Sequence, residues 1–356
     1  MRQLTYRMTF STPAFLGNAE RAAQWRTPPL KALLRQWWRV VYAAQHRSAS
    51  VSAMRSVEGR LFGHAWLESD ADATGHAVAA RRSPVRLRLS AWRLGTLQAS
   101  RWSGLQAVQH PEVSQPVAAD LYLGFGPVVL PKGQRVPTLK SSAAIQAGEA
   151  AMLTIAVPDH EVQRIERALG LIANYGTVGG RSRNGWGSLA LEPVGETPGF
   201  PETLEESLTL AWRDAICADW PQAIGRDERG PLIWHTEPQP DWQRVIRRLA
   251  EIKIALRTRF RFPHERPDGE VHDRHWLSYP ITNHKVQAWD RAGLRLPNSL
   301  RFKVRPDPDG KLRGVIFHMP CLPPPAFRPD RAAIERVWQQ VHAHLDDDRK
   351  LQRIRA

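Results

Sequence analysis

The chain has 356 residues, of which 42% are hydrophobic and 24% charged, a balance typical of a folded protein of about two domains and not of a disordered chain. It has no run of roughly 18 apolar residues and no signal-peptide core at its N-terminus, so we expect a cytoplasmic protein without a membrane span. Its two cysteines, Cys217 and Cys321, lie far apart, which excludes a disulfide framework and a cysteine zinc site.

The formal net charge is +15, which predicts a polyanionic partner. The excess is uneven, because residues 1–190 carry 23 basic and 11 acidic side chains and the rest of the chain carries 27 and 24. A genome that favours arginine would explain the abundance of arginine but not this shortage of acids. The first half is therefore expected to hold more of the binding surface.

The first half shows the patterns of alternating strands and helices. Residues 4–10 alternate apolar with polar side chains, which predicts a half-buried strand. Thr27 as N-cap and Pro28 in the first turn predict a helix of about four turns. We then expect a helix over 54–67, a strand with one basic face over 81–92, a weaker strand over 121–130, a strand over 150–157, a helix over 160–174 and a strand over 186–191.

This order is that of the ferredoxin-like split βαβ pattern, which RNA-recognition domains also use. The Gly- and Pro-rich segment 195–201 predicts a linker between a domain at 1–195 and a second at 202–356. In the second domain we expect helices near 204–218, 241–258 and 330–345, and a hairpin of 300–304 and 315–319 turned by Asp309 and Gly310. The predicted fold class is α+β, with two ferredoxin-like domains and helical insertions.

A basic column runs along the first helix. Lys31, Arg35 and Arg39 are four residues apart, so they lie on one face, and each such repulsion costs roughly 0.2–0.5 kcal/mol. No acidic residue of the same helix relieves it, so the column favours an external anion over a merely solvated face.

A glycine loop spans residues 176–187. Its glycines leave room for backbone N–H groups to approach a phosphate, and its arginines add charge. The segment ends in a strand and lacks a Walker pattern, so a nucleotide P-loop is not expected; the alternative is a glycine-ended helix followed by a tight turn. We expect Trp186 to be exposed and to stack on a base, and Trp37 and Trp38 to lie in the core. The candidate RNA-binding residues of this loop are Gly176, Gly179, Gly180, Arg181, Ser182, Arg183 and Trp186.

Several motifs taken together resemble the RAMP superfamily of CRISPR-associated proteins, with the closest likeness to a RAMP subunit of the type III-B (Cmr) effector. They are residues 12–18, 26–39 and 58–63, the glycine loop, and, in the second half, residues 277–280 and 294–304. Asn18 and Ala32 stand where many relatives have glycine.

The resemblance implies two ferredoxin-like domains packed together in an antiviral, RNA-guided complex with other RAMP subunits. It implies a non-catalytic subunit, without a cofactor or metal, that binds guide RNA (crRNA) near its 3′ end and helps to recognise target RNA. Lys31, Arg35, Arg39 and the glycine loop are the RNA contacts carried over from the family.

Other interpretations remain open. A metal-independent RAMP endoribonuclease would need a histidine as general base, and His160 and the stretch from His264 to His284 are candidates. His272-Asp273 matches the dipeptide of metal-dependent phosphohydrolases, but Asp268, Asp290, His275 and their neighbours lie in a segment predicted as loop, so we expect no metal site. The acidic run 346–348 is interpreted as a solvated surface, and a ribosomal or tRNA-binding module is the third class.

Overall fold

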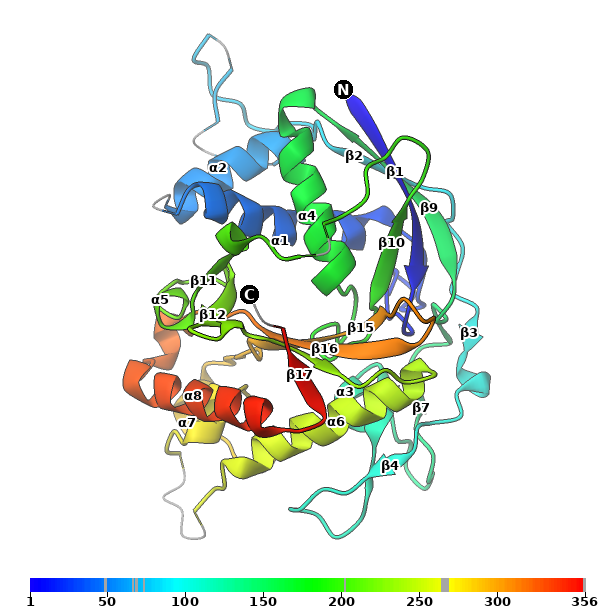
Figure 1. The fold of residues 1–356 in the computed structure, drawn as a ribbon, viewed down its shortest axis with the longest axis vertical. Coiled ribbons are helices and arrows are strands. Elements are labelled where there is room, and N and C mark those ends of the chain that lie inside the picture. The colour runs from blue at the N-terminus through cyan, green and yellow to red at the C-terminus, as the bar shows by residue number, and fades with distance from the viewer. Residues whose placement is uncertain are drawn as a thin grey trace. The chain divides into compact units, whose positions relative to one another are not determined.

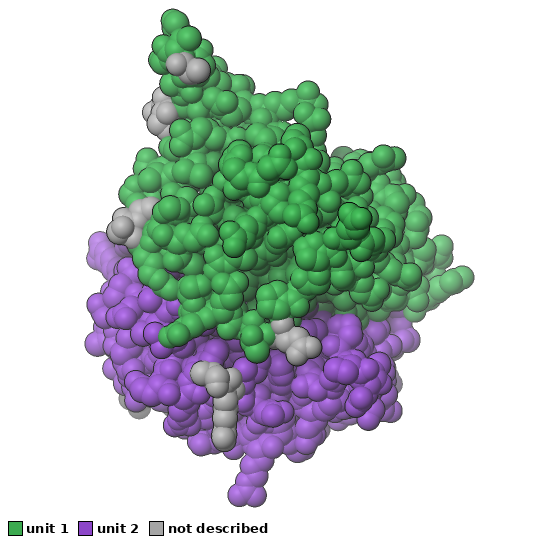
Figure 2. Space-filling model, turned by 45° about the horizontal axis from the view of Figure 1, so that its top comes forward, with its two compact units in different colours: residues 1–101, 139–182, 186–208 green, residues 102–138, 183–185, 209–356 purple. Residues whose placement is uncertain are grey.

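The computed structural model describes residues 1–47, 50–65, 67, 70–72, 74–201, 203–263 and 269–354. The chain forms two compact units, coloured separately in Figure 2. The first unit comprises residues 1–101, 139–182 and 186–208, and the second comprises residues 102–138, 183–185 and 209–356. The units are therefore discontinuous, in contrast to the two consecutive domains predicted from the sequence.

The first unit is built on a four-stranded antiparallel sheet. Its strands are β1 (Arg2–Phe10), β2 (Arg86–Leu89), β9 (Ala150–Val157) and β10 (Leu189–Pro193), in the order β10-β1-β9-β2. The register places Tyr6 opposite Leu153 on one side and Pro193 on the other. Helices α1 (Thr27–Gln45) and α4 (Val162–Tyr175) pack against each other and on the sheet (Figure 1). The strand–helix–strand–strand–helix–strand order predicted for this part is confirmed.

The alternating pattern of β1 explains this packing. Leu4, Tyr6, Met8 and Phe10 are fully buried, because every second side chain of a strand points to the same face. The boundaries of the neighbouring elements differ from the predictions. Arg26, not Thr27, is the N-cap of α1, and α2 covers Val51–Phe62, where Ser50 caps its first turn. The predicted strand over 81–92 is shortened to β2, and the helix predicted from 160 begins at Val162 after a 3-10 turn.

The second unit contains a sheet with the same connectivity. Its strands are β14 (Ile233–Thr236), β15 (Leu300–Pro306), β16 (Leu312–His318) and β17 (Leu351–Arg353), in the antiparallel order β15-β16-β14-β17. Helix α6 (Trp242–Arg259) follows the first of these strands and α8 (Arg331–Asp347) follows the third. The predicted hairpin and the helices near 241–258 and 330–345 are confirmed, with Gly310 in the left-handed region of the turn.

Other predictions for the connections are wrong. Of the weak strand expected over 121–130, Val128–Val129 form strand β6, but the part up to residue 124 belongs to a short helix, α3 (Ala119–Gly124). The region 204–218, expected to be a helix, contains β11 (Thr209–Ala211) and the single turn α5 (Trp212–Ala215). The expected linker at 195–201 packs on the first unit instead, where the ring of Phe200 stacks on Tyr6 at 5.2 Å. An aromatic residue inside the Gly/Pro-rich segment accounts for this docking.

The remaining elements are short. Strands β12 and β13 pair in the second unit, and helix α7 carries the buried Trp289. The bounds are β12 (Ile224–Asp227), β13 (Gly230–Pro231) and α7 (Gln287–Arg291). The other two-residue strands are β3 (Leu97–Gln98), β4 (Ala107–Val108), β5 (Val117–Ala118), β6 (Val128–Val129), β7 (Thr138–Leu139) and β8 (Ala143–Ala144). In the part of the chain that the structure describes, every helix is too short or too polar to cross a lipid bilayer.

Two buried histidines join the sheet of the second unit to α8. His342 Nε2 lies 2.9 Å from His318 Nδ1, and Ser299 Oγ lies 2.9 Å from His318 Nε2. Burial lowers the pKa of His342 to about 3 and the pKa of His318 well below its usual value. Both rings are therefore neutral in the folded protein at neutral pH.

This pair predicts acid sensitivity of the second unit. Below pH 6.5 each of these histidines binds a proton in the unfolded chain but stays neutral in the folded protein. The free energy of unfolding should therefore fall by about 1.4 kcal/mol for each pH unit and each histidine. Thermal unfolding measured from pH 7 to pH 4.5 should show this loss, and His342→Gln should reduce its pH dependence. The exposed His160→Gln is the matched control, and an equal slope in all three proteins would contradict the assignment.

Candidate nucleic-acid interface

The basic column of α1 has an internal counterion. Arg35 Nε donates to Glu58 Oε1 at 2.8 Å, and Arg39 Nη2 donates to both carboxylate oxygens of Glu58, at 2.8 and 2.9 Å. Glu58 belongs to α2 and is buried. The expectation that only an external anion could relieve the column is therefore wrong, because the relieving acid comes from a different helix.

The column nevertheless keeps a positive surface. One carboxylate is shared by two arginines, whose side chains remain 38% and 39% exposed. Lys31 lies one turn earlier, and burial together with the charge of Arg35 lowers its pKa. Two guanidinium groups held by a buried acid are pre-oriented, so a phosphate placed against them meets charges that are already fixed in position.

Arg35 and Glu58 also border a hollow of about 330 Å³ beside α1 and α2, here called the α1–α2 hollow. Arg35, Arg55, Glu58 and His64 line it, and Arg55 is exposed. His64 Nε2 lies 2.7 Å from Asp70 Oδ2, a carboxylate that also accepts from Arg81 at 2.6 Å. Neither Arg55 nor His64 is among the residues predicted from the sequence, although both lie beside the motif at 58–63.

The backbone of the glycine loop packs on the segment that follows β1. Gly180 N–H donates to Phe15 O at 3.0 Å, and Gly187 N–H donates to Pro13 O at 2.9 Å. A Cβ at Gly179 would lie 2.8 Å from Phe15 O, and one at Gly187 would lie 1.9 Å from Val178 O. Two of the amides expected to cradle a phosphate are thus already hydrogen-bonded, and these glycines are required by close backbone packing.

The side chains of the loop differ in their exposure. Arg181 and Arg183 are exposed, and Arg181 has a left-handed backbone with φ of 56°. Gly176 and Ser182 are buried and half-buried. Trp186 is 0% exposed and its ring lies 5.3 Å from that of Phe15. The prediction that Trp186 stacks on a base from the surface is wrong, because the loop folds back and places the indole in the core. Trp37 and Trp38 lie in the core, as predicted.

The histidine-rich stretch is held by its own backbone. His272 N–H donates to His275 Nδ1 at 2.9 Å, and His275 Nε2 lies 3.0 Å from His284 O, so both ring nitrogens of His275 are engaged. Burial lowers the pKa of His275 to about 4. Part of this predicted loop is a 3-10 helix, Asp273–Trp276. His264 and Asp268 lie outside the described residues.

The acidic candidates pair with arginines. Asp273 accepts from Arg336 at 3.0 Å, and Asp348 accepts from Arg248 at 2.6 Å. Asp346 accepts from the indole of Trp234 at 2.8 Å, so the run 346–348 fixes the end of α8 where a solvated surface was expected. Among the residues placed in the structure, no three His, Cys, Asp or Glu side chains gather closely enough to hold a metal ion.

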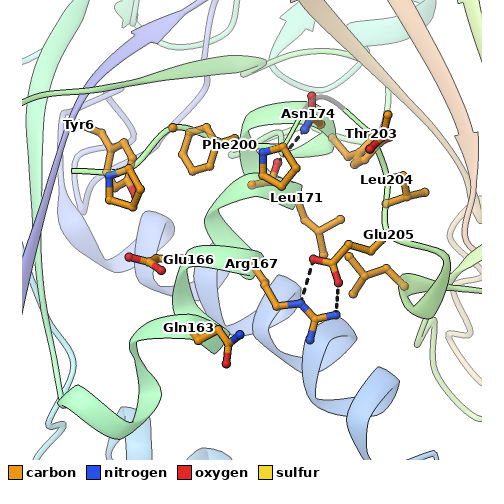
Figure 3. Close-up of a pocket in the computed structure, with 16 residues that line it drawn as sticks. Tyr6, Gln163, Glu166, Arg167, Leu171, Asn174, Phe200, Thr203, Leu204 and Glu205 are labelled. Atoms are coloured by element: carbon orange, nitrogen blue, oxygen red, sulfur yellow. Dashed lines mark hydrogen bonds and ion pairs between the residues drawn. The ribbon is translucent and has the colours of Figure 1, made fainter. Parts of the chain in front are cut away.

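A separate pocket of about 200 Å³ lies in the first unit between α4 and segment 198–208 (Figure 3). Arg167 and Glu205 close one side through hydrogen bonds of 3.0 and 2.6 Å. Tyr6 and Phe200 form an aromatic wall, and the pKa of Tyr6 is raised by burial and then by the charge of Glu166. Its acidic and apolar lining does not suit a phosphate.

No protein-family model matches the chain, and no curated protein is similar to it in sequence. Among solved structures, Cmr1 from Pyrococcus furiosus in its apo form is similar over 99% of this chain and 98% of that one, with 13% identity and a TM-score of 0.47. A chain of the type III-B Cmr-beta complex bound to cognate target RNA covers 95% of this chain and 99% of its own, with 11% identity and a TM-score of 0.44. A chain of a type IV-B CRISPR complex covers 58% of this chain and 96% of its own, with 12% identity and a TM-score of 0.30. The first two of these structures are Cmr proteins.

Proposed function

We propose that this protein is a non-catalytic RNA-binding subunit of a type III-B CRISPR effector complex, which binds the 3′ region of the guide RNA and assists target recognition beside other RAMP subunits. The observation that carries the proposal is the arginine column of α1, half-exposed and fixed by the buried carboxylate of Glu58. The net charge of +15 and the basic first half of the chain support a polyanionic partner.

The connectivity of the two sheets supports the proposed fold. In each unit the fourth strand lies beside the first, and the third lies between the first and the second. This is the order of a ferredoxin-like domain, so we assign a ferredoxin-like core to each unit. RNA-recognition domains use the same connectivity, although fold alone does not fix a ligand.

The column is suited to a phosphodiester backbone. A guanidinium group can donate two parallel hydrogen bonds to a phosphate. Among the described residues, Glu58 accepts a hydrogen bond from Nε of Arg35 only, so the Nη groups of Arg35 can bind a phosphate. Arg55 extends the basic surface across the α1–α2 hollow. Contacts of this kind position a strand without reading its sequence, as a subunit that accepts any guide requires.

The runner-up function is a metal-independent endoribonuclease that processes guide RNA. One observation bears on it: His64 lines the α1–α2 hollow, where Asp70 holds Nε2 and leaves the buried Nδ1 as the ring nitrogen that would have to take the proton. His275 is not suited to this role, because both of its ring nitrogens are engaged. A ribosomal or tRNA-binding role would be revealed by sequencing the RNA that co-purifies with the protein.

Replacing Lys31, Arg35 and Arg39 with Ala should weaken binding of single-stranded RNA whatever its sequence. Losing three phosphate contacts should reduce the slope of log affinity against log salt by roughly 2, at about 0.7 per contact. Filter binding at salt concentrations from roughly 50 to 300 mM measures the slope. A triple variant of Arg229, Arg331 and Arg336, exposed arginines of the second unit, is the control. An unchanged slope in a folded α1 variant would remove this helix from the interface.

Glu58→Gln separates the structural from the electrostatic role of the column. The free energy of unfolding should fall by roughly 1–3 kcal/mol, because two arginines lose a shared charged acceptor. RNA affinity at low salt should rise, because the arginines are no longer neutralised. A variant that folds but binds RNA more weakly would show that Glu58 positions the arginines more than it screens them.

End-labelled single-stranded RNA incubated with excess protein should remain intact in magnesium, in manganese and in EDTA. The matched variants are His64→Gln and a His272/His275 double Ala variant. Cleavage by the wild type that persists in EDTA and disappears in His64→Gln would overturn the binding-subunit proposal and establish the endoribonuclease.

A further inference from the structure

Arg301 is a buried cation to which the described residues offer no ion-pair partner. It lies on β15, the edge strand of the second sheet, and is only 7% exposed. Its Nε is fully buried and has no hydrogen-bond acceptor among the described residues. No carboxylate of the described chain forms an ion pair with it. A buried arginine normally has such a partner, because an uncompensated charge is costly to remove from water.

The tip of the glycine loop brings a second arginine to the same strand. Phe302, which follows Arg301 in the chain, donates its backbone N–H to Arg183 O at 2.9 Å, so the backbone of Arg183 lies beside β15. Asn184 then fixes the tip, because its Nδ2 donates to Leu123 O at 2.7 Å and its Oδ1 accepts from Lys253 Nζ at 2.7 Å. The position of Arg183 is therefore set by several hydrogen bonds within the second unit.

The charges around Arg183 and Arg301 favour the binding of an anion. Burial and then the charge of Arg183 lower the pKa of Arg301 to about 9, so the group is cationic at neutral pH. The other titratable neighbours are Cys321, whose thiol pKa is raised by burial, and His318, whose pKa burial lowers, so both are neutral at neutral pH. Among the described residues, two cations, a neutral thiol and a neutral imidazole leave the positive charge uncompensated.

We propose that Arg183 and Arg301 form a binding site for a phosphate group in the second unit, distinct from the column of α1. Two guanidinium groups of different exposure suit a tetrahedral anion that reaches Arg301 past the exposed Arg183. The phosphate is supplied by RNA, a choice of source that rests on the proposed function. The glycine loop thus contributes to phosphate binding through an arginine held at its tip, and not through its backbone amides.

The stability of the full chain tests the site with inorganic phosphate as the probe. The wild-type melting temperature should rise with phosphate, beyond sodium chloride of equal ionic strength, and saturate. Arg301→Met should melt at or above the wild-type temperature without phosphate, because it removes an uncompensated buried charge, and should not respond to phosphate. A merely structural Arg301 would give the opposite result, a lower melting temperature without phosphate.

Arg183→Met provides a second measurement should Arg301→Met fail to fold. It should raise at least tenfold the phosphate concentration that gives half of the rise in melting temperature. Arg295→Met changes an exposed arginine of the same unit and is the control, so it should leave that concentration unchanged. An equal response in all four proteins, or none in the wild type, would overturn the site.

Short RNA distinguishes the sources of the phosphate. Tetranucleotides with a 5′-phosphate, with a 3′-phosphate and with neither should all compete if the site takes an internal phosphodiester, and only one phosphorylated form should compete if it takes a terminal group. Competition by none of them, with inorganic phosphate still binding, would contradict RNA as the source. The α1 triple variant should keep the phosphate response, so failure of the RNA interface and failure of this site give different results.

Discussion

The central strand β1 is the constraint on which the first unit depends. It lies between β9 and β10, so its backbone is paired on both sides, while its alternate side chains form the centre of the core. The chain that leaves β1 then supplies the platform for the glycine loop, through the carbonyl groups of Pro13 and Phe15. The strand that builds the core therefore also sets where the loop lies, and a change in its register would move both.

Charge in this protein is organised by acids that are distant in sequence. Glu58 reaches the arginines of α1 from a neighbouring helix, and Asp348 reaches Arg248 of α6 from the end of α8. Such pairs hold cations in place without cancelling the positive excess. Arg301 is the exception, because the described residues offer it no acid.

Local patterns predicted most of the regular elements. The alternation of β1, the proline in the first turn of α1 and the turn of the hairpin in the second unit depend on neighbouring residues alone, and each is where the sequence indicates. Features that depend on distant contacts could not be predicted. The buried Trp186 lies against Phe15, far away in the sequence, and the shared counterion Glu58 lies 19 residues or more from the arginines it binds. The discontinuous units arise in the same way, because α3 and β4 of segment 102–138 pack on α6, which follows them much later in the chain.

The interrupted course of the chain has a consequence for how the protein can be divided. Residues 102–138 and 183–185 belong to the second unit, although they lie between parts of the first. Helix α3, for example, packs on α6. A fragment ending near residue 195 would carry α3 and the loop tip without the sheet and helix that they pack on. The two units are thus inseparable by any single cut, and a gene encoding either one would have to be rejoined from pieces.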